Sequence, residues 1–224
     1  ELGQLEEAVK CYEQALAIKP DYVEAHSNLG VTLQELGQLE TAVKHFEQAL
    51  VIKPDYAEAH YNLGVTLYEF GQLDAAVKRY EQALAIKPDY AEAYNNLGNA
   101  LKELNQPEAA VKRYEQALAI KPDYAEAYNN LGITFKALGQ LETVVKYYEQ
   151  ALAIKPGYTK AYNNLGNIFQ ELGQLEAAIK HYEQALAIKP DYAEAWNNVF
   201  FIGKALDLSA TQNAWIESYK KKLN

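Results

Sequence analysis

The sequence predicts an all-α solenoid built from 34-residue repeats, each holding two helices. Proline recurs with this period, and most of the residues around it recur as well. The prolines are Pro20, Pro54, Pro88, Pro122, Pro156 and Pro190. A fixed period of this length is typical of a solenoid, in which each repeat buries its apolar face only by stacking on its neighbours. Such a fold presents a long surface and has no single closed core around an active site.

The proline period also sets the repeat boundaries. Each repeat begins two residues after the Asp or Gly that follows a proline. We expect an array over 1–192, with a partial repeat, 1–22, and five whole repeats, 23–56, 57–90, 91–124, 125–158 and 159–192. The segment 193–224 diverges, and we expect it to hold a last repeat and a C-terminal capping helix over 210–222. The chain has no methionine and begins within a repeat, so we expect it to be a fragment or a processed piece.

Helical periodicity places two helices in each whole repeat. In 91–124, apolar residues at i, i+3, i+7 and i+10 predict a first helix over about 91–104. A second pattern predicts a helix over about 107–120, beginning with a proline, which a helix tolerates in its first turn. Pro122 ends the second helix because proline cannot continue it.

An Asp-x-x-Glu pattern, such as Asp55 with Glu58, precedes the first helix of most repeats. Aspartate is a favoured N-cap residue, and a glutamate three residues later completes a capping box. We therefore expect aspartate to cap these helices. At one junction Gly157 and Lys160 replace the pair, so we expect a missing cap there, at a cost of about 1 kcal/mol.

The repeats resemble the tetratricopeptide repeat family. Its signature residues are met in 91–124 by Tyr94, Leu97, Gly98, Leu101, Ala110, Tyr114 and Pro122. The resemblance covers about 1–206. It implies antiparallel helix pairs stacked into a right-handed superhelix, with the first helix of each repeat lining a concave groove. Glycine inside these helices indicates that a neighbouring helix approaches closely, and Phe200 replaces it in the last repeat.

Composition excludes several function classes. The net charge of −9 argues against nucleic-acid phosphates and anionic membranes as partners. No apolar run is long enough for a membrane span, and Cys11 is the only cysteine. The histidines do not cluster at metal spacing, so we expect no metal, no cofactor and no enzymatic activity. The sequence names no compartment, and we favour the cytoplasm.

One groove position is asparagine in every repeat: Asn28, Asn62, Asn96, Asn130, Asn164 and Asn198. Asparagine is a poor residue for a helix interior, so the column needs a reason. Either each carboxamide bonds a neighbouring repeat and fixes the stacking, or the column binds the backbone of an extended peptide. The second reading resembles the superhelix of the O-linked N-acetylglucosamine transferases, where ladder asparagines hold substrate peptides. Both readings can hold together.

The other groove positions differ in character between the two halves of the chain. Apolar and aromatic residues lie in the N-terminal half, namely Val31, Val65, Tyr61 and Tyr68. Polar and basic residues follow, namely Asn95, Asn99, Asn129, Asn163, Asn167, Lys102 and Lys136. We expect a ligand that is apolar at one end and polar or acidic at the other. Lys160 adds a positive charge near the ladder, which favours acidic peptides.

We therefore predict a non-catalytic scaffold that binds an extended or helical peptide in its concave groove, with micromolar affinity. A second reading is the substrate-recruiting domain of a larger enzyme such as a glycosyltransferase. A third is end-to-end stacking into a homo-oligomer through the helix over about 5–18, whose apolar residues Leu5, Ala8, Tyr12 and Ala15 lack a partner helix.

Overall fold

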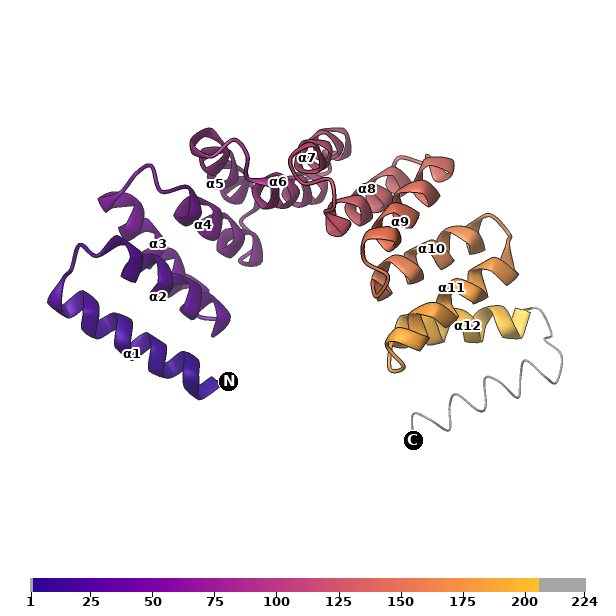
Figure 1. Cartoon of the computed structure of the whole chain (residues 1–224), viewed down its shortest axis with the longest axis horizontal. Helices are drawn as coiled ribbons and strands as arrows, with labels where there is room; N and C mark the ends of the chain where they lie inside the picture. The colour runs from indigo at the N-terminus through magenta and orange to yellow at the C-terminus, as the bar shows by residue number, and fades with distance from the viewer. Residues whose placement is uncertain (1, 206–224) are drawn as a thin grey trace. The chain divides into compact units, whose positions relative to one another are not determined.

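The computed structural model describes residues 2–205, and these residues fold entirely into α-helices and short connections (Figure 1). The first helices of the repeats are α2 (Val23–Glu35), α4 (Ala57–Glu69), α6 (Ala91–Glu103), α8 (Ala125–Ala137), α10 (Thr159–Glu171) and α12 (Ala193–Ala205). The second helices are α1 (Leu2–Ile18), α3 (Leu39–Ile52), α5 (Leu73–Ile86), α7 (Pro107–Ile120), α9 (Leu141–Ile154) and α11 (Leu175–Ile188). The expected capping helix over 210–222 lies outside the described residues.

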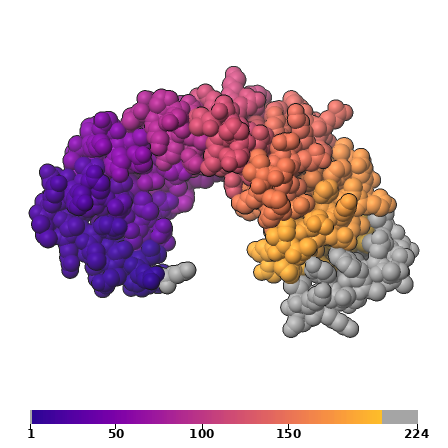
Figure 2. Space-filling view, viewed as in Figure 1, coloured from indigo at the N-terminus to yellow at the C-terminus, as the bar shows by residue number. Residues whose placement is uncertain are grey.

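The chain divides into two compact units, with the boundary between Pro122 and Asp123. In the N-terminal unit, consecutive helices from α1 to α7 pack against each other. The same nearest-neighbour order holds from α8 to α12 in the C-terminal unit. The atoms of the N-terminal unit, indigo to magenta in Figure 2, form a continuous surface. This packing is what the solenoid prediction requires.

The helix boundaries follow the sequence signals closely. Helix α6 ends one residue before the expected end, and α7 spans the expected residues with its proline in the first turn. Between first and second helices, one residue of the turn has a left-handed backbone. It is glycine in most repeats, as at Gly71 with φ 78°, and Asn105 with φ 59° in 91–124. Glycine and asparagine are the residues that tolerate this conformation at a helix end.

The expected capping boxes are wrong. In repeat 57–90 the N-cap is Tyr56, in extended conformation, and no side chain bonds the helix N-terminus. Asp55 precedes the cap by one residue. Glu58 instead forms an ion pair with Lys87 at the end of α5, at 3.6 Å. The Asp-x-x-Glu pattern is local, whereas the partner of the glutamate comes from the other helix of the same repeat.

The close approach expected at the first-helix glycines is confirmed. A Cβ atom on Gly98 would lie 2.5 Å from Cε1 of Tyr114, and one on Gly64 would lie 2.7 Å from Cε1 of Tyr80. Real Cβ contacts are never this short, so the ring of the second helix occupies the place of a side chain. Each glycine therefore seats the aromatic ring that joins the two helices of its repeat.

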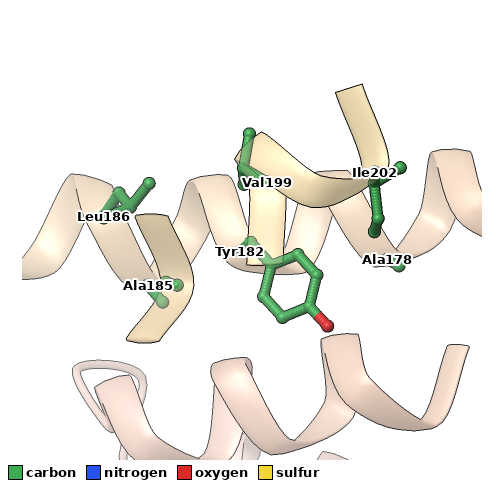
Figure 3. Close-up of a cluster of buried hydrophobic side chains, with 7 residues drawn as sticks. Ala178, Tyr182, Ala185, Leu186, Val199 and Ile202 are labelled. Atoms are coloured by element: carbon green, nitrogen blue, oxygen red, sulfur yellow. The ribbon is translucent and has the colours of Figure 1, made fainter. Parts of the chain in front are cut away.

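The C-terminal unit closes on a cluster around Tyr182, shown in Figure 3. Tyr182 of α11 is fully buried, and Val199 and Ile202 of α12 cover it. Phe200, which replaces the expected glycine, is 48% exposed. At the other end, α1 packs against α2, and the apolar residues that the sequence led us to expect without a partner helix are half-buried; they are Leu5, Ala8, Tyr12 and Ala15.

Candidate functional site

Four positions of each first helix carry the residues that the sequence singled out. Counting from the first residue of the repeat, they are positions 5, 6, 9 and 12, which share one side of the helix because of its 3.6-residue turn. We call this side the asparagine face. In the N-terminal unit it holds Asn28, Val31, Tyr61, Asn62, Val65, Tyr68, Asn95, Asn96, Asn99 and Lys102. In the C-terminal unit it holds Asn129, Asn130, Lys136, Asn163, Asn164, Asn167 and Asn198.

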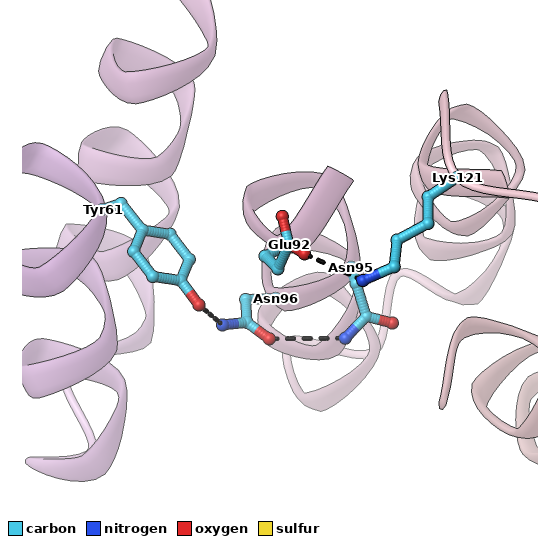
Figure 4. A network of polar contacts seen from close by, with 5 residues as sticks. All are labelled: Tyr61, Glu92, Asn95, Asn96 and Lys121. Atoms are coloured by element: carbon cyan, nitrogen blue, oxygen red, sulfur yellow. Dashed lines mark hydrogen bonds and ion pairs between the residues drawn. The ribbon is translucent and has the colours of Figure 1, made fainter. Parts of the chain in front are cut away.

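In the N-terminal unit, the position 6 asparagine reaches back to the preceding repeat (Figure 4). Nδ2 of Asn96 donates to the hydroxyl of Tyr61 at 3.0 Å, and Oδ1 of Asn96 lies 3.4 Å from Nδ2 of Asn95. Asn95 is only 4% exposed. The Tyr61 ring packs against Tyr90, with ring centroids 4.7 Å apart. This network joins α4 to α6.

The C-terminal unit repeats the arrangement with asparagine at both ends. Nδ2 of Asn164 donates to Oδ1 of Asn129 at 3.2 Å. Nδ2 of Asn198 donates to Oδ1 of Asn163 at 3.3 Å and to Oδ1 of Asn167 at 3.0 Å. Asn129 and Asn163 are each 4% exposed, so the acceptors are buried. The stacking role considered for the column is therefore present at these positions.

The column is not uniform. Asn28 is exposed, whereas Asn62, Asn130 and the other members are half-buried. Within the described residues, neither Asn28 nor Asn62 uses its side chain in a hydrogen bond, while Asn130 is engaged. The N-terminal unit thus contains asparagines whose amides are not committed to stacking.

Position 12 forms a second line of bonds between repeats, directed to the glutamate at position 13 of the next repeat. Nε2 of Gln34 donates to Glu69 at 3.1 Å, and the Tyr68 hydroxyl donates to Glu103. In the C-terminal unit, Lys136 and Glu171 form an ion pair at 2.6 Å. The carboxylate of Glu171 therefore balances the positive charge of Lys136. Lys102 lies one turn beyond Asn99 on α6 and makes no ion pair within the described N-terminal unit.

Position 9 meets the tyrosine of the second helix. The Tyr114 hydroxyl donates to Oδ1 of Asn99 at 2.8 Å, and the Tyr182 hydroxyl donates to Oδ1 of Asn167 at 2.8 Å. Val65 takes this position in repeat 57–90. Beside it is a cavity of about 200 Å³ on the asparagine face of the N-terminal unit, lined by Val65, Tyr68, Glu69, Tyr80, Asn96 and Asn99.

Lys160 interrupts a series of ion pairs inside the repeats. Position 2 is glutamate elsewhere and pairs with the lysine that ends the second helix, as Glu92 does with Lys121 at 3.2 Å and Glu126 with Lys155 at 2.8 Å. Burial raises the pKa of Glu92, but its bond to its own backbone N–H and the Lys121 ammonium lower that pKa below the ordinary value overall. Lys160 is exposed at the start of α10.

Tyr80 was not singled out from the sequence as a functional residue. A comparison across repeats would have found it. The residue that faces the second-helix tyrosine is asparagine in two repeats, whereas in 57–90 it is valine. The residues that the structure describes contain no group of three or more potential metal ligands. None of the described helices has the length and hydropathy that a membrane crossing requires.

Known families and structures match the chain over most of its length. Family profiles described as "TPR repeat" match residues 1–37 and 98–139, and profiles described as "Tetratricopeptide repeat" match 21–89, 80–112, 125–158 and 159–192. No curated protein matches.

Solved structures share the fold at low sequence identity. A crystal structure of MamA is 26% identical, with 74% of this chain and 97% of that chain covered and a TM-score of 0.66. PilF of Pseudomonas aeruginosa is 22% identical over 90% of each chain, with a TM-score of 0.77. YrrB, described as a TPR protein with an unusual peptide-binding site, is 22% identical over 84% of this chain and 97% of its own, with a TM-score of 0.65. With its repeat profiles and its stacked helix pairs, this chain belongs to the tetratricopeptide repeat family.

Proposed function

We propose that the chain binds an extended peptide on its asparagine face and has no catalytic activity of its own. Tetratricopeptide repeat proteins serve as protein-interaction scaffolds, which sets the class of function. One structural neighbour, YrrB, is described as having a peptide-binding site. The asparagine face carries carboxamides in consecutive repeats.

The observation that carries the proposal is that the asparagine side chains keep N–H and C=O groups that are not used in bonds between repeats. A carboxamide offers two N–H donors and one carbonyl acceptor. Asn164 gives one N–H to Asn129, which leaves a second N–H and its own carbonyl for a ligand. Asn62 gives none within the described residues. Such a pair of groups matches the N–H and C=O of a peptide backbone, so binding would be largely independent of peptide sequence.

The net charge of the chain favours a peptide ligand over a nucleic acid. The chain carries a net charge of −9, which opposes phosphate backbones. Lys160, exposed at the start of α10 where other repeats have glutamate, supplies a local positive charge. We expect a modest preference for acidic residues near Lys160, and less near Lys136, because Glu171 already balances that ammonium.

The test uses peptides selected from a random display library against the whole chain. Binding of a labelled selected peptide is measured by fluorescence anisotropy, and we expect a dissociation constant in the micromolar range because ordering a flexible peptide opposes its contacts. Asn62→Ala should weaken binding about fivefold to tenfold, the effect of one or two hydrogen bonds. This variant breaks no bond between repeats within the described residues.

The matched control is Lys112→Ala on α7, a second helix, whose exposed side chain lies off the asparagine face. It should leave the affinity unchanged. If Asn62→Ala has no effect while Lys112→Ala weakens binding, the asparagine face is the wrong surface. If no library peptide binds the folded chain, the proposed function itself fails.

A further inference from the structure

The second-helix tyrosines place their hydroxyls at position 9 of the first helix in the same repeat. Tyr114 and Tyr182 each find an asparagine oxygen there, at 2.8 Å. In repeat 23–56 the ring is Phe46, which has no hydroxyl, and the facing residue is Val31. In these repeats, a second-helix hydroxyl faces a hydrogen-bond acceptor, and a ring without a hydroxyl faces an apolar residue.

Repeat 57–90 breaks that pairing. Tyr80 is 1% exposed, yet position 9 is Val65, which cannot accept a hydrogen bond. Within the described residues, no hydrogen bond to the Tyr80 hydroxyl is formed. Tyr148 stands opposite Ile133 in the same way in the C-terminal unit. The buried side-chain N and O atoms without a hydrogen-bond partner, among the described residues, are Nδ1 of His60 and Nδ1 of His181, so the Tyr80 hydroxyl keeps some access to solvent and can donate to a ligand group that accepts from it.

The Tyr80 hydroxyl lies at the cavity. Both Tyr80 and Val65 line the space of about 200 Å³, and the geometry of the sibling repeats brings the hydroxyl to position 9. Burial raises the pKa of Tyr80, and the proximity of Tyr61, Tyr68 and Glu69 raises it further. The hydroxyl therefore stays protonated at neutral pH and remains a donor.

The remaining cavity groups define the ligand's chemistry. Oδ1 of Asn99 accepts from Tyr114, so the amide of Asn99 is oriented and its Nδ2 is left to donate. Glu69, whose carboxylate accepts from Gln34, is the charged acceptor in the lining. Val65 and the Tyr68 ring form the apolar wall. The lining of the cavity thus combines hydrogen-bond donors, a carboxylate and an apolar wall.

Three ligand classes fit poorly. An aliphatic side chain leaves the Tyr80 hydroxyl unpaired. A carboxylate would meet the like charge of Glu69, and an ammonium group accepts nothing from Asn99. A primary carboxamide fits each group, because its oxygen accepts from Tyr80 and Asn99 while its N–H donates to Glu69.

We propose that this cavity is a subsite for a glutamine side chain of the bound peptide, whose two methylenes pack on Val65 and Tyr68 and whose carboxamide bonds Tyr80, Asn99 and Glu69. The subsite rests on the proposed peptide binding and names the residue that the N-terminal unit prefers. It makes recognition at this point dependent on peptide sequence, unlike the backbone contacts elsewhere on the face.

The test uses propionamide, the analogue of the glutamine side chain, titrated into the ¹⁵N-labelled chain and followed by NMR. We expect saturable shifts of the Asn99 side-chain amide. Propionate, the glutamate analogue, and butanone, which lacks the N–H donor, should bind more weakly. Equal binding of either compound would overturn the assignment, as would the absence of any shift at Asn99.

Two variants copy pairs that the chain already uses. Tyr80→Phe recreates the Phe46–Val31 pair and should weaken propionamide binding about fivefold, the effect of one neutral hydrogen bond. Val65→Asn recreates the Asn99–Tyr114 pair, so it should engage the hydroxyl and abolish binding. Tyr182→Phe, which removes a hydroxyl in the C-terminal unit, is the matched control and should leave propionamide binding unchanged. Unchanged affinity for propionamide in both Tyr80→Phe and Val65→Asn would contradict the proposal.

The two proposals fail in different ways. If library peptides bind the chain without any preference for glutamine and are insensitive to Tyr80→Phe, the subsite is wrong and peptide binding stands. If propionamide binds as described but no peptide does, the subsite is real and the peptide-binding function is wrong.

Discussion

The bond from Asn164 to Asn129 gives a quantitative test of stacking by the asparagine column. Asn164→Ala removes the N–H that Asn129 accepts at 3.2 Å, and Asn129 is only 4% exposed. The matched variant is Asn28→Ala, at the same position of another repeat, where the side chain is exposed and makes no hydrogen bond within the described residues. The two variants differ in the lost bond and share the change in helix propensity.

The magnitudes follow from these contacts. Replacing asparagine by alanine inside a helix stabilises it by about 0.6 kcal/mol. Leaving the buried Asn129 acceptor unpaired costs about 1–3 kcal/mol. Asn164→Ala should therefore lower the free energy of unfolding by about 1 kcal/mol, whereas Asn28→Ala should raise it by about 0.6 kcal/mol.

Urea unfolding of both variants measures the change, and native-state hydrogen exchange locates it. Because repeats open locally, faster exchange in Asn164→Ala should be concentrated in α8 and α10. Exchange in α2 should slow slightly in Asn28→Ala. Equal shifts of the two urea midpoints would refute the stacking role, since the lost bond is the feature in which the variants differ.

Three further outcomes are expected. Gly98→Ala should lower the free energy of unfolding by about 1–3 kcal/mol, measured in urea, because its Cβ would overlap the second-helix ring at 2.5 Å. Lys160→Glu should restore the ion pair with Lys189 and raise stability by up to about 0.5 kcal/mol at low salt, an effect that 1 M salt should remove. Burial lowers the pKa of His45, and its contact with His26 lowers it further. The unfolded chain therefore binds protons more readily, so stability should be fully present above about pH 6.5 and should fall as the pH drops through the folded-state pKa. His45→Arg should reduce this loss in urea midpoints compared between pH 7.5 and pH 5.5.

The period of the sequence was sufficient to predict the helices and their pairing. The break at Asn105 and the proline at 107 located the ends of α6 and α7 to within one residue. Gly98 correctly indicated a close contact, because few other reasons justify glycine inside a helix. These signals lie within one repeat, where local propensity and nearest-neighbour packing act together.

Interactions that cross between helices were harder to predict. Glu58 was assigned to a cap because its spacing from Asp55 fits one, but the ammonium of Lys87 is its partner. Lys136 was expected to attract acidic peptides, yet Glu171 of the next repeat pairs with it. Tyr80 looked like its siblings until the residue facing it was compared. In each case the decisive neighbour lies 29 or 35 residues away or in the facing helix, beyond the reach of a local pattern.

The most direct test of the central claim is an NMR titration of a library-selected peptide into the ¹⁵N-labelled chain. If the asparagine face binds peptides, the side-chain amides of Asn164 and Asn198, both in the C-terminal unit, should shift and saturate together at micromolar peptide, while the backbone amides of Lys112 and Gln116 on α7 stay unchanged. Shifts confined to the second helices, with these two asparagine amides unmoved, would contradict the account.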